Sequence, residues 1–275
     1  MAGSKSRMPS ERLVERWIRA GYGQGEGSQY KPFLYVRDVP SRGTSSMVKS
    51  RITDRTHHYL SKQELKVHLL STYQPNVVDI REQFALLPRS ETAEISENIG
   101  IRHPVYPGTN TPTVMTTDLL ITIEQNSDQK LLAISAKLSK DLSDRNIEKL
   151  RIEQLYWERR GVKWILATEK NIPAYLSKNL EFFENTLHDE RVTECSITPT
   201  EFSMEFERNH CATLCFNQIL SLTSRRMNLD ASTGFSLLGV AVWAQISRID
   251  LNKDYITHRA FVNLQDQRVR RHEFI

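Results

Sequence analysis

The 275-residue sequence has only three cysteines and no long apolar run. Cys195, Cys211 and Cys215 are odd in number and form no CxxC pair, which argues against a disulfide framework and against a zinc ribbon. The longest nearly apolar stretch, residues 235–246, is well short of the roughly 20 residues that cross a bilayer, so we expect no membrane segment. Residues 1–7 lack the apolar centre of a signal peptide. Together these absences predict a soluble protein of the reducing cytoplasm.

Positive charge is concentrated at the beginning of the chain, because residues 1–60 carry +6 and residues 61–275 carry −2 within a net charge of +4. Aromatic residues are interspersed with these cations: Tyr22, Tyr30, Phe33 and Tyr35. Such a pattern suits a DNA backbone, although a solvated surface is the commoner reason for a run of charge. The tail has a second basic segment, for which an exposed terminus is a simpler explanation than DNA contact. It consists of Arg268, Arg270, Arg271 and His272.

The most informative pattern is an aspartate and a lysine at the ends of two apolar stretches. Asp118 lies in the first stretch, and Lys137 follows it by 19 positions in the second. Alternate side chains of a strand share a face, so Ser135 and Lys137 point the same way. The intervening residues 124–130 are rich in turn formers and predict an antiparallel hairpin, which would bring Asp118 next to Lys137.

A carboxylate and a lysine on neighbouring strands are the groups with which a metal-dependent nuclease builds its site. The carboxylate holds Mg²⁺ or Mn²⁺ against the scissile phosphate, and the ammonium orients the attacking water or offsets the charge on phosphorus. For any single Asp/Lys pair, however, a solvated strand end with a snorkelling lysine is the commoner arrangement. The pair alone is therefore a weak indication of function.

Residues 60–72 have the pattern of a helix in which Ser61 is the N-cap and Glu64 the third helical residue. A glutamate at that position closes a capping box, because its carboxylate accepts a hydrogen bond from the unpaired backbone at the helix start. This structural role explains Glu64 without any chemistry. A catalytic role for Glu64 needs evidence from outside the segment.

Two further glutamates fall on apolar faces. Glu82 lies on the apolar side of a predicted strand at residues 77–84, where it is a metal ligand or, more simply, the partner of an Arg or Lys at the edge of the core. Glu153 lies on the inward stripe of a predicted helix at residues 146–160. It belongs either to the edge of a site or to an ion pair with Lys149.

The predicted elements follow the order helix, strand, hairpin, helix, strand, which describes a three-layer α/β nuclease core. The last of these strands is predicted at residues 162–168. A basic, loop-rich arm over residues 1–56, with one helix at residues 11–19, precedes the core, and a looped segment at residues 88–113 precedes the hairpin.

The C-terminal part of the chain predicts a smaller unit that is rich in helix. Its helical candidates are residues 175–187, 200–227 and 236–245. A strand at residues 248–251 would supply a wing. The chain length also favours two domains, which we place at residues 1–172 and 173–275.

Several short motifs occur in one fixed order over most of residues 20–170. They are Gly23-Gln24-Gly25, Tyr30 with Pro32, Asp38-Val39-Pro40-Ser41, His57-His58 with Leu60-Ser61, Asp79-Ile80-Arg81-Glu82-Gln83-Phe84, His103-Pro104-Val105, Thr117-Asp118, and Glu148-Lys149-Leu150 leading to Tyr156-Trp157. Together they resemble TnsA, the endonuclease subunit of the heteromeric Tn-seven-like cut-and-paste transposases. An ordered set of this kind is far more specific than any one motif.

The resemblance implies a restriction-endonuclease-like domain of the PD-(D/E)xK type, in which Glu64, Asp118 and Lys137 are catalytic and the two acids bind Mg²⁺ or Mn²⁺. The chain departs from the broader nuclease pattern at Ser135, where an acid or an amide usually precedes the lysine by two positions. A hydroxyl is a poorer metal ligand than a carboxylate. The backbone carbonyl of Ala136, the middle residue of that motif, can also coordinate, so the resemblance implies Ser135 and Ala136 as metal ligands beside Glu64 and Asp118. Residues 173–275, where the resemblance is weak, are expected to form a winged-helix-like domain that binds partners.

The resemblance further implies cleavage of the 5′ strand at the transposon ends of double-stranded DNA. The implied partners are a DDE-type transposase (TnsB) and an ATP-dependent regulator (TnsC). A stand-alone restriction-type endonuclease is the first alternative, and unaided cleavage of a plasmid would distinguish it. A non-catalytic DNA-binding or assembly protein that retains the nuclease fold is the second, and Ser135 is the feature that favours it.

Overall fold

The protein, in a computed structural model, is described over residues 9–38, 44–126 and 128–266 and divides into two compact units. The first unit comprises Met1–His68 and Pro75–Asn171, and the second comprises Leu69–Gln74 and Ile172–Ile275. The basic tail and residues 39–41 of the matched motifs lie outside the described residues. Within the described ranges, no helix is both long enough and apolar enough to cross a membrane.

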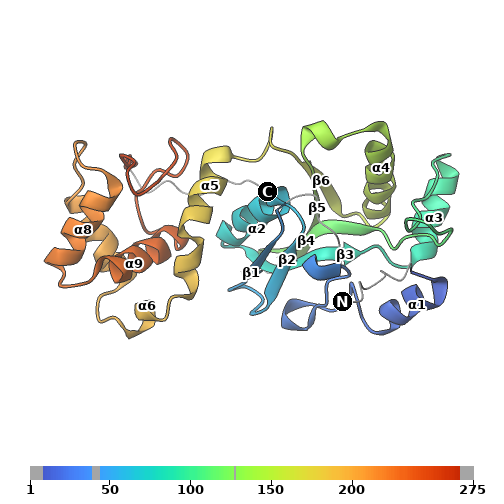
Figure 1. Ribbon diagram of the computed structural model, residues 1–275, viewed down its shortest axis with the longest axis horizontal. Coiled ribbons are helices and arrows are strands. Elements are labelled where there is room, and N and C mark those ends of the chain that lie inside the picture. Colours follow the sequence, from blue (N-terminus) through green and yellow to red (C-terminus); the bar gives the residue numbers. More distant parts are fainter. Residues whose placement is uncertain (1–8, 39–43, 127, 267–275) are drawn as a thin grey trace, which may run out of the picture. The chain divides into compact units, whose positions relative to one another are not determined.

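The predicted site residues lie on or next to helices and strands of the first unit (Figure 1). In chain order it contains α1 (Glu11–Arg19), η1 (Gly27–Gln29), η2 (Val36–Asp38), β1 (Ser46–Lys49), β2 (Thr56–Tyr59), α2 (Lys62–Tyr73), β3 (Val77–Ala85), α3 (Arg89–Asn98), β4 (Thr116–Gln125), β5 (Asp128–Ala136), η3 (Ser139–Asp141), α4 (Asp144–Glu158) and β6 (Lys163–Ala167). The end of α2 belongs to the second unit, which also contains α5 (Ala174–Phe183), η4 (Glu184–His188), α6 (Arg191–Glu194), α7 (Pro199–Arg208), α8 (Phe216–Arg226) and α9 (Ala231–Trp243).

A four-stranded mixed sheet with the strand order β3-β4-β5-β6 forms the centre of the first unit. β3 and β5 each pair antiparallel with β4, whereas β6 pairs parallel with β5. The predicted hairpin is confirmed, and its turn contains Asn126 in a left-handed conformation (φ 53°) that asparagine tolerates well. A parallel pair of strands needs a long crossover connection, and α4 lies in the connection between β5 and β6. The sheet confirms the predicted restriction-endonuclease-like α/β architecture.

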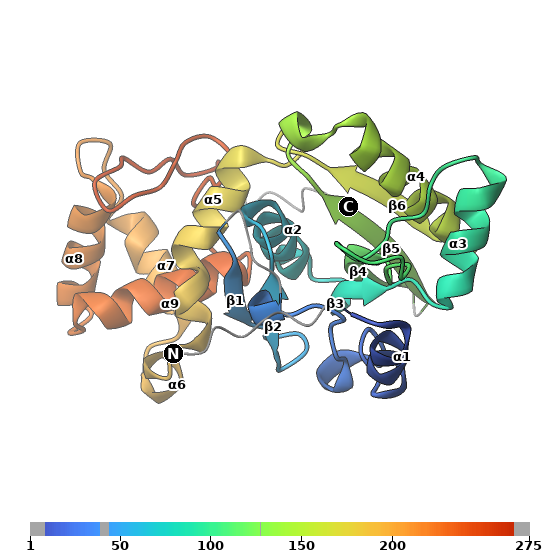
Figure 2. The ribbon, with the colours of Figure 1, turned by 45° about the vertical axis from the view of Figure 1, so that its right-hand side comes forward.

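Helices α3 and α4 cover one face of this sheet (Figure 2). Their buried side chains pack with those of the strands in one cluster that includes Ile95, Leu120, Ala133, Ile152, Tyr156 and Trp157. In both views the strands lie between α4 and α2. Asp118 lies near the start of β4 and Lys137 directly follows the end of β5, so these two predicted site residues lie at strand ends.

The first unit contains a helix and a hairpin that the sequence did not predict. α3 lies in the segment at residues 88–113 that was expected to be looped, and Ile95 is its one large apolar residue, so its hydrophobic periodicity is too weak to predict a helix. The β1–β2 hairpin lies at the end of the expected arm. Each of its strands has four residues, which is too short for a clear alternation.

The N-terminal part of the chain packs along β3. Tyr30 and Phe33 are buried, and the backbone N–H of Phe33 donates to the carbonyl of Gln83 (3.1 Å). Gly23 lies so close to β3 that a Cβ atom there would be 2.2 Å from the Cβ of Ala85. Tyr30 and Phe33 therefore stabilise the fold. That the basic N-terminal region suits a DNA backbone stays a prediction.

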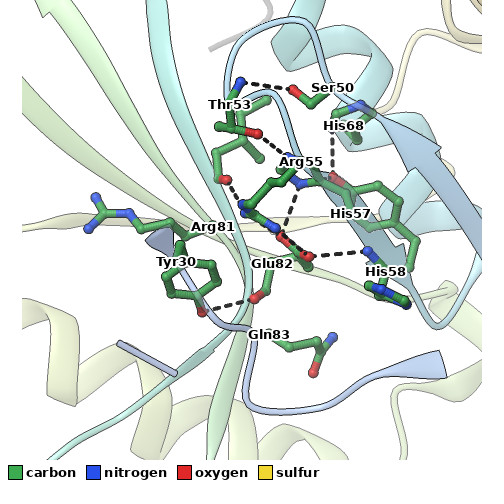
Figure 3. Close-up of polar contacts among 12 residues, drawn as sticks. Tyr30, Ser50, Thr53, Arg55, His57, His58, His68, Arg81, Glu82 and Gln83 are labelled. Carbon is green, nitrogen blue, oxygen red and sulfur yellow. Dashed lines mark hydrogen bonds and ion pairs between the residues drawn. The ribbon is translucent and has the colours of Figure 1, made fainter. Parts of the chain in front are cut away.

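A buried ion-pair network joins the β1–β2 hairpin to β3 (Figure 3). Glu82 on β3 is 0% exposed, and its two carboxylate oxygens accept hydrogen bonds from Arg55 at 2.8 and 2.7 Å. The Nδ1 atom of His57 lies 2.9 Å from the same carboxylate, which also accepts the backbone N–H of His58 (3.1 Å). The interpretation of Glu82 as the partner of an arginine at the edge of the core is confirmed.

The second unit is helical, as predicted, but the expected helix at residues 200–227 is two helices, α7 and α8. α8 starts anew because Cys215 is its N-cap, where the backbone N–H donates to the side chain of Gln218 (2.9 Å). Among the described residues, the expected strand at residues 248–251 forms only an isolated bridge between Ile249 and Leu264. The winged-helix-like character of this unit stays a prediction.

We expect Arg55→Met to lower the free energy of unfolding by roughly 3 kcal/mol, because it leaves the carboxylate of Glu82 charged and buried without its main partner. Urea unfolding measures the loss. Arg51→Met is the matched control, since Arg51 is exposed in the same hairpin and should lose well under 1 kcal/mol. Equal losses in both variants would contradict the importance of the buried pair.

Candidate active site

The structure brings the three predicted catalytic residues together from three elements. Asp118 lies on β4, Lys137 directly follows β5, and Glu64 lies in the first turn of α2. The β4–β5 register pairs Leu119 with Ile134, and its continuation puts Asp118 opposite Ser135 and makes Lys137 the diagonal neighbour of Asp118. The Nζ atom of Lys137 donates to Oδ2 of Asp118 at 2.6 Å. The predicted contact between these two residues is confirmed.

Glu64 and Ser61 make the predicted capping contact, except that the backbone donor to the carboxylate is Leu60, one residue before the N-cap. Its backbone N–H donates to the hydroxyl oxygen of Ser61 (3.2 Å), whose own hydrogen is donated to Oε1 of Glu64 (2.8 Å). Oε2 accepts the backbone N–H of Leu60 (2.9 Å). The same oxygen also accepts a hydrogen bond from the side-chain amide of Gln83 (3.2 Å), which donates in addition to Oδ1 of Asp118 (3.4 Å). Glu64 therefore caps its helix and faces Asp118 at the same time.

The charges in this cluster are unbalanced. Burial, together with the nearby charge of Asp118, raises the pKa of Glu64 to about 7. Burial alone would lower the pKa of Lys137, but the charge and hydrogen bond of Asp118 and the charge of Glu64 outweigh it, so this pKa lies above its usual value. One ammonium thus serves two carboxylates, and the site favours a further cation.

A third carboxylate lies beside the expected position of the missing acid. Glu153 on α4 is 4% exposed, and its Oε1 atom accepts hydrogen bonds from the hydroxyls of Ser135 and Thr117 and from the indole N–H of Trp164. Burial and the charge of Asp118 raise the pKa of Glu153 to about 7. The structure thus directs the hydroxyl of Ser135 to Glu153.

Ala136 contacts the site through its backbone. Its N–H donates to Oδ2 of Asp118 at 2.8 Å, the same oxygen that accepts Lys137. Oδ2 of Asp118 thus accepts two hydrogen bonds, and the other oxygen, Oδ1, accepts the amide of Gln83. The roles expected for the Ser135 hydroxyl and the Ala136 carbonyl as metal ligands stay predictions.

A cavity of about 390 Å³ opens next to these residues within the first unit. Asp118, Lys137 and Glu153 line one part of it, and Lys149 adds a second cation. Burial lowers the pKa of Lys149, and the charges of neighbouring cations lower it further. Most of the remaining lining is apolar or aromatic, such as Phe33 and Tyr106. The cavity thus combines carboxylates for a metal with cations for a phosphate.

The donor set suits magnesium better than zinc. Over the ranges that the structure describes, no three His, Cys, Asp or Glu residues are arranged to hold a metal ion. Glu64 and Asp118 nevertheless meet at one amide nitrogen, and Mg²⁺ is commonly held by one or two carboxylates with several retained waters. These two residues therefore fit Mg²⁺ or Mn²⁺.

Comparisons with known proteins match the same region. Residues 74–169 match the family model described as TnsA-like endonuclease N terminal. The transposon Tn7 transposition protein TnsA of Escherichia coli is 40% identical over 182 residues, which are 66% of this chain and 65% of that relative. The predicted resemblance to TnsA is confirmed. The aligned region thus spans slightly less than two thirds of TnsA, and the TnsA-like segment contains Asp118, Lys137 and Glu153, whereas Glu64 precedes it.

The sequence did not single out Gln83 or the network around Glu82. Gln83 is one of four polar or charged residues among the nine of β3, so its position in the sequence carries no signal that separates it from Asp79 or Arg81. His57 was noted as part of a matched motif, but its contact with Glu82 joins residues far apart in the chain and has no local pattern.

We expect the free energy of unfolding of metal-free Glu64→Gln to increase relative to that of the unchanged chain as the pH rises from about 4.5 to about 7. The pKa of Glu64 is raised from 4.5 to about 7 on folding, so the stability that its protonated form contributes is fully present below pH 4.5 and is lost as the pH passes 7. The difference between the variants should grow by on the order of 2–3 kcal/mol over this window. Urea unfolding in EDTA at several pH values measures it.

The exposed Glu97 on α3 offers a matched control. Glu97→Gln should shift stability by less than about 0.5 kcal/mol at every pH in the series. If the difference in free energy of unfolding between Glu64→Gln and the unchanged chain stays constant between pH 4.5 and 8, the pKa of Glu64 is not raised on folding.

Proposed function

We propose that this chain is the metal-dependent DNA endonuclease subunit of a heteromeric transposase, cutting the 5′ strand at each transposon end. The cluster of Asp118, Lys137 and Glu64 is the main support, because it combines two metal-binding acids with a cation beside a cavity. The similarity to a protein named as a transposition protein supports the biological setting.

Glu64 and Asp118 would hold Mg²⁺, which when bound polarises the phosphoryl oxygen and lowers the pKa of a bound water. Lys137 acts as a hydrogen-bond donor and a cation, because its raised pKa keeps it protonated and unsuited to accept a proton. It orients the attacking water and offsets charge on phosphorus, a contribution on the order of several kcal/mol to the barrier. Lys149 lies on the same cavity wall and is placed to contact a neighbouring phosphate.

The partners in this proposal are double-stranded DNA, a DDE-type transposase of the TnsB kind and an ATP-dependent regulator of the TnsC kind. Residues 173–275 would supply the partner-binding surface, since they lie outside the TnsA-like segment. A dependence on partners would keep the nuclease silent until both transposon ends are assembled.

The competing candidate is a non-catalytic assembly protein, which the hydroxyl of Ser135 favours because an acid or amide is usual there. The carboxylate of Glu153 beside Ser135 weakens this alternative, as does the close pair of Asp118 and Lys137. A stand-alone restriction-type endonuclease remains the other enzyme to be tested.

We expect Asp118→Ala to lower 5′-strand cleavage of labelled transposon-end DNA by at least about 100-fold, because it removes a metal ligand and the partner of Lys137. Strand-resolved gels in Mg²⁺, with and without the partner transposase and regulator, measure cleavage. Asp128→Ala is the matched control, since Asp128 is exposed in the turn of the same hairpin.

Three outcomes separate the candidates. Partner-dependent 5′ cuts that vanish only in Asp118→Ala support the transposase subunit. Cleavage by the chain alone supports the restriction-type enzyme. Equal cleavage by Asp118→Ala and Asp128→Ala would remove Asp118 from the site and favour the assembly protein.

A further inference from the structure

Gln83 departs from regular strand geometry at a buried position. It lies within β3, is 2% exposed and has a φ of 47°, in the left-handed region that residues with a side chain rarely adopt. Its neighbours on both sides pair regularly with β4, so Gln83 faces Asp118 across the two strands. A strained backbone persists only where the surroundings hold it, and such residues cluster at functional sites.

The side-chain amide of Gln83 contacts both acids of the candidate site. Its nitrogen carries two hydrogens and donates to Oε2 of Glu64 (3.2 Å) and to Oδ1 of Asp118 (3.4 Å). Its oxygen accepts the hydroxyl of Thr116 (3.1 Å), which fixes the end of the amide that faces the acids. A neutral group with two donors therefore lies between two carboxylates that would otherwise repel each other.

Contacts from the N-terminal part of the chain hold this backbone conformation (Figure 3). The hydroxyl of Tyr30 donates to the carbonyl of Glu82 (3.0 Å), and the N–H of Phe33 donates to the carbonyl of Gln83 (3.1 Å). The side chain of Glu82 is itself fixed by Arg55. Both peptide groups that flank the left-handed residue are thus restrained, and with them the direction of its amide.

We propose that Gln83 is a positioning residue of the metal site, whose amide holds Glu64 and Asp118 at a common cation position before the metal binds. This inference rests on the proposed function, because it concerns the same two metal ligands. A bound cation takes over the role of the two N–H donors. Without the amide, repulsion separates the two acids, and metal binding must then bring them back together.

Gln83→Gly removes the amide and leaves a residue that adopts a positive φ without strain. We expect the affinity of the full chain for Mn²⁺ to fall by about 10- to 100-fold, the loss that is typical when a group that orients metal ligands is removed. Gln83→Met should show the same loss, since it keeps a similar volume without N–H donors. Gln83→Asn retains an amide, tolerates the left-handed conformation and should recover part of the affinity. Calorimetric titration with Mn²⁺ measures all four proteins without any cleavage.

Asn126→Gly is the matched control, because Asn126 has a similar φ of 53° in the exposed turn of the β4–β5 hairpin. Its Mn²⁺ affinity should equal that of the unchanged chain. If Gln83→Gly binds Mn²⁺ as tightly as the unchanged chain, the positioning role is refuted while the nuclease proposal stands. Gln83→Met decides in the same way if Gln83→Gly does not fold. If the unchanged chain binds no Mn²⁺, the metal site and this inference fail together.

Discussion

The buried carboxylate of Glu82 is the constraint on which the catalytic unit depends. Burial alone would raise its pKa, but hydrogen bonds from His57 and Arg55 lower it to about 2, so it remains charged. A buried charge that loses its partner costs several kcal/mol, and the β1–β2 hairpin must therefore pack on β3 with both Arg55 and His57 in place. Because the hairpin leads directly into α2, its position also sets that of Leu60 and Glu64.

β3 separates two opposite electrostatic environments. On the hairpin side, a single carboxylate is surrounded by donors from Arg55 and His57. On the other side, Asp118 accepts the ammonium of Lys137 near Glu64 and Glu153, and burial with the nearby charge of Asp118 raises the pKa of the two glutamates to about 7. An excess of buried carboxylate over cation is the condition under which a site gains most from a divalent metal ion. The fold therefore holds in place a negative charge that its own residues do not neutralise.

Local patterns in the sequence predicted the central hairpin and, through it, the contact between Asp118 and Lys137. Glu64 could not be assigned from its helix alone, because a capping carboxylate and a metal ligand require the same residue at the same place. In the structure the side chain caps the helix and also accepts a hydrogen bond from Gln83, which contacts Asp118 as well, so capping leaves room for the metal-ligand role that stays a prediction. Gln83 could not be predicted, because no sequence pattern marks a left-handed residue in a strand and its acidic partners are 19 and 35 residues away.

Ser135 departs from the usual nuclease pattern, and a buried carboxylate on α4, that of Glu153, accepts its hydroxyl. A carboxylate at position 135 would lie against Glu153, whose pKa burial and Asp118 already raise to about 7, and two adjacent buried acids could not both remain ionised. The hydroxyl of Ser135 instead supplies a donor to Glu153. The third acid thus comes from a residue 18 positions later, which lines the same cavity as Lys137. A motif defined by spacing along β5 misses this acid, whereas the packing of α4 on the sheet places it in the cavity wall.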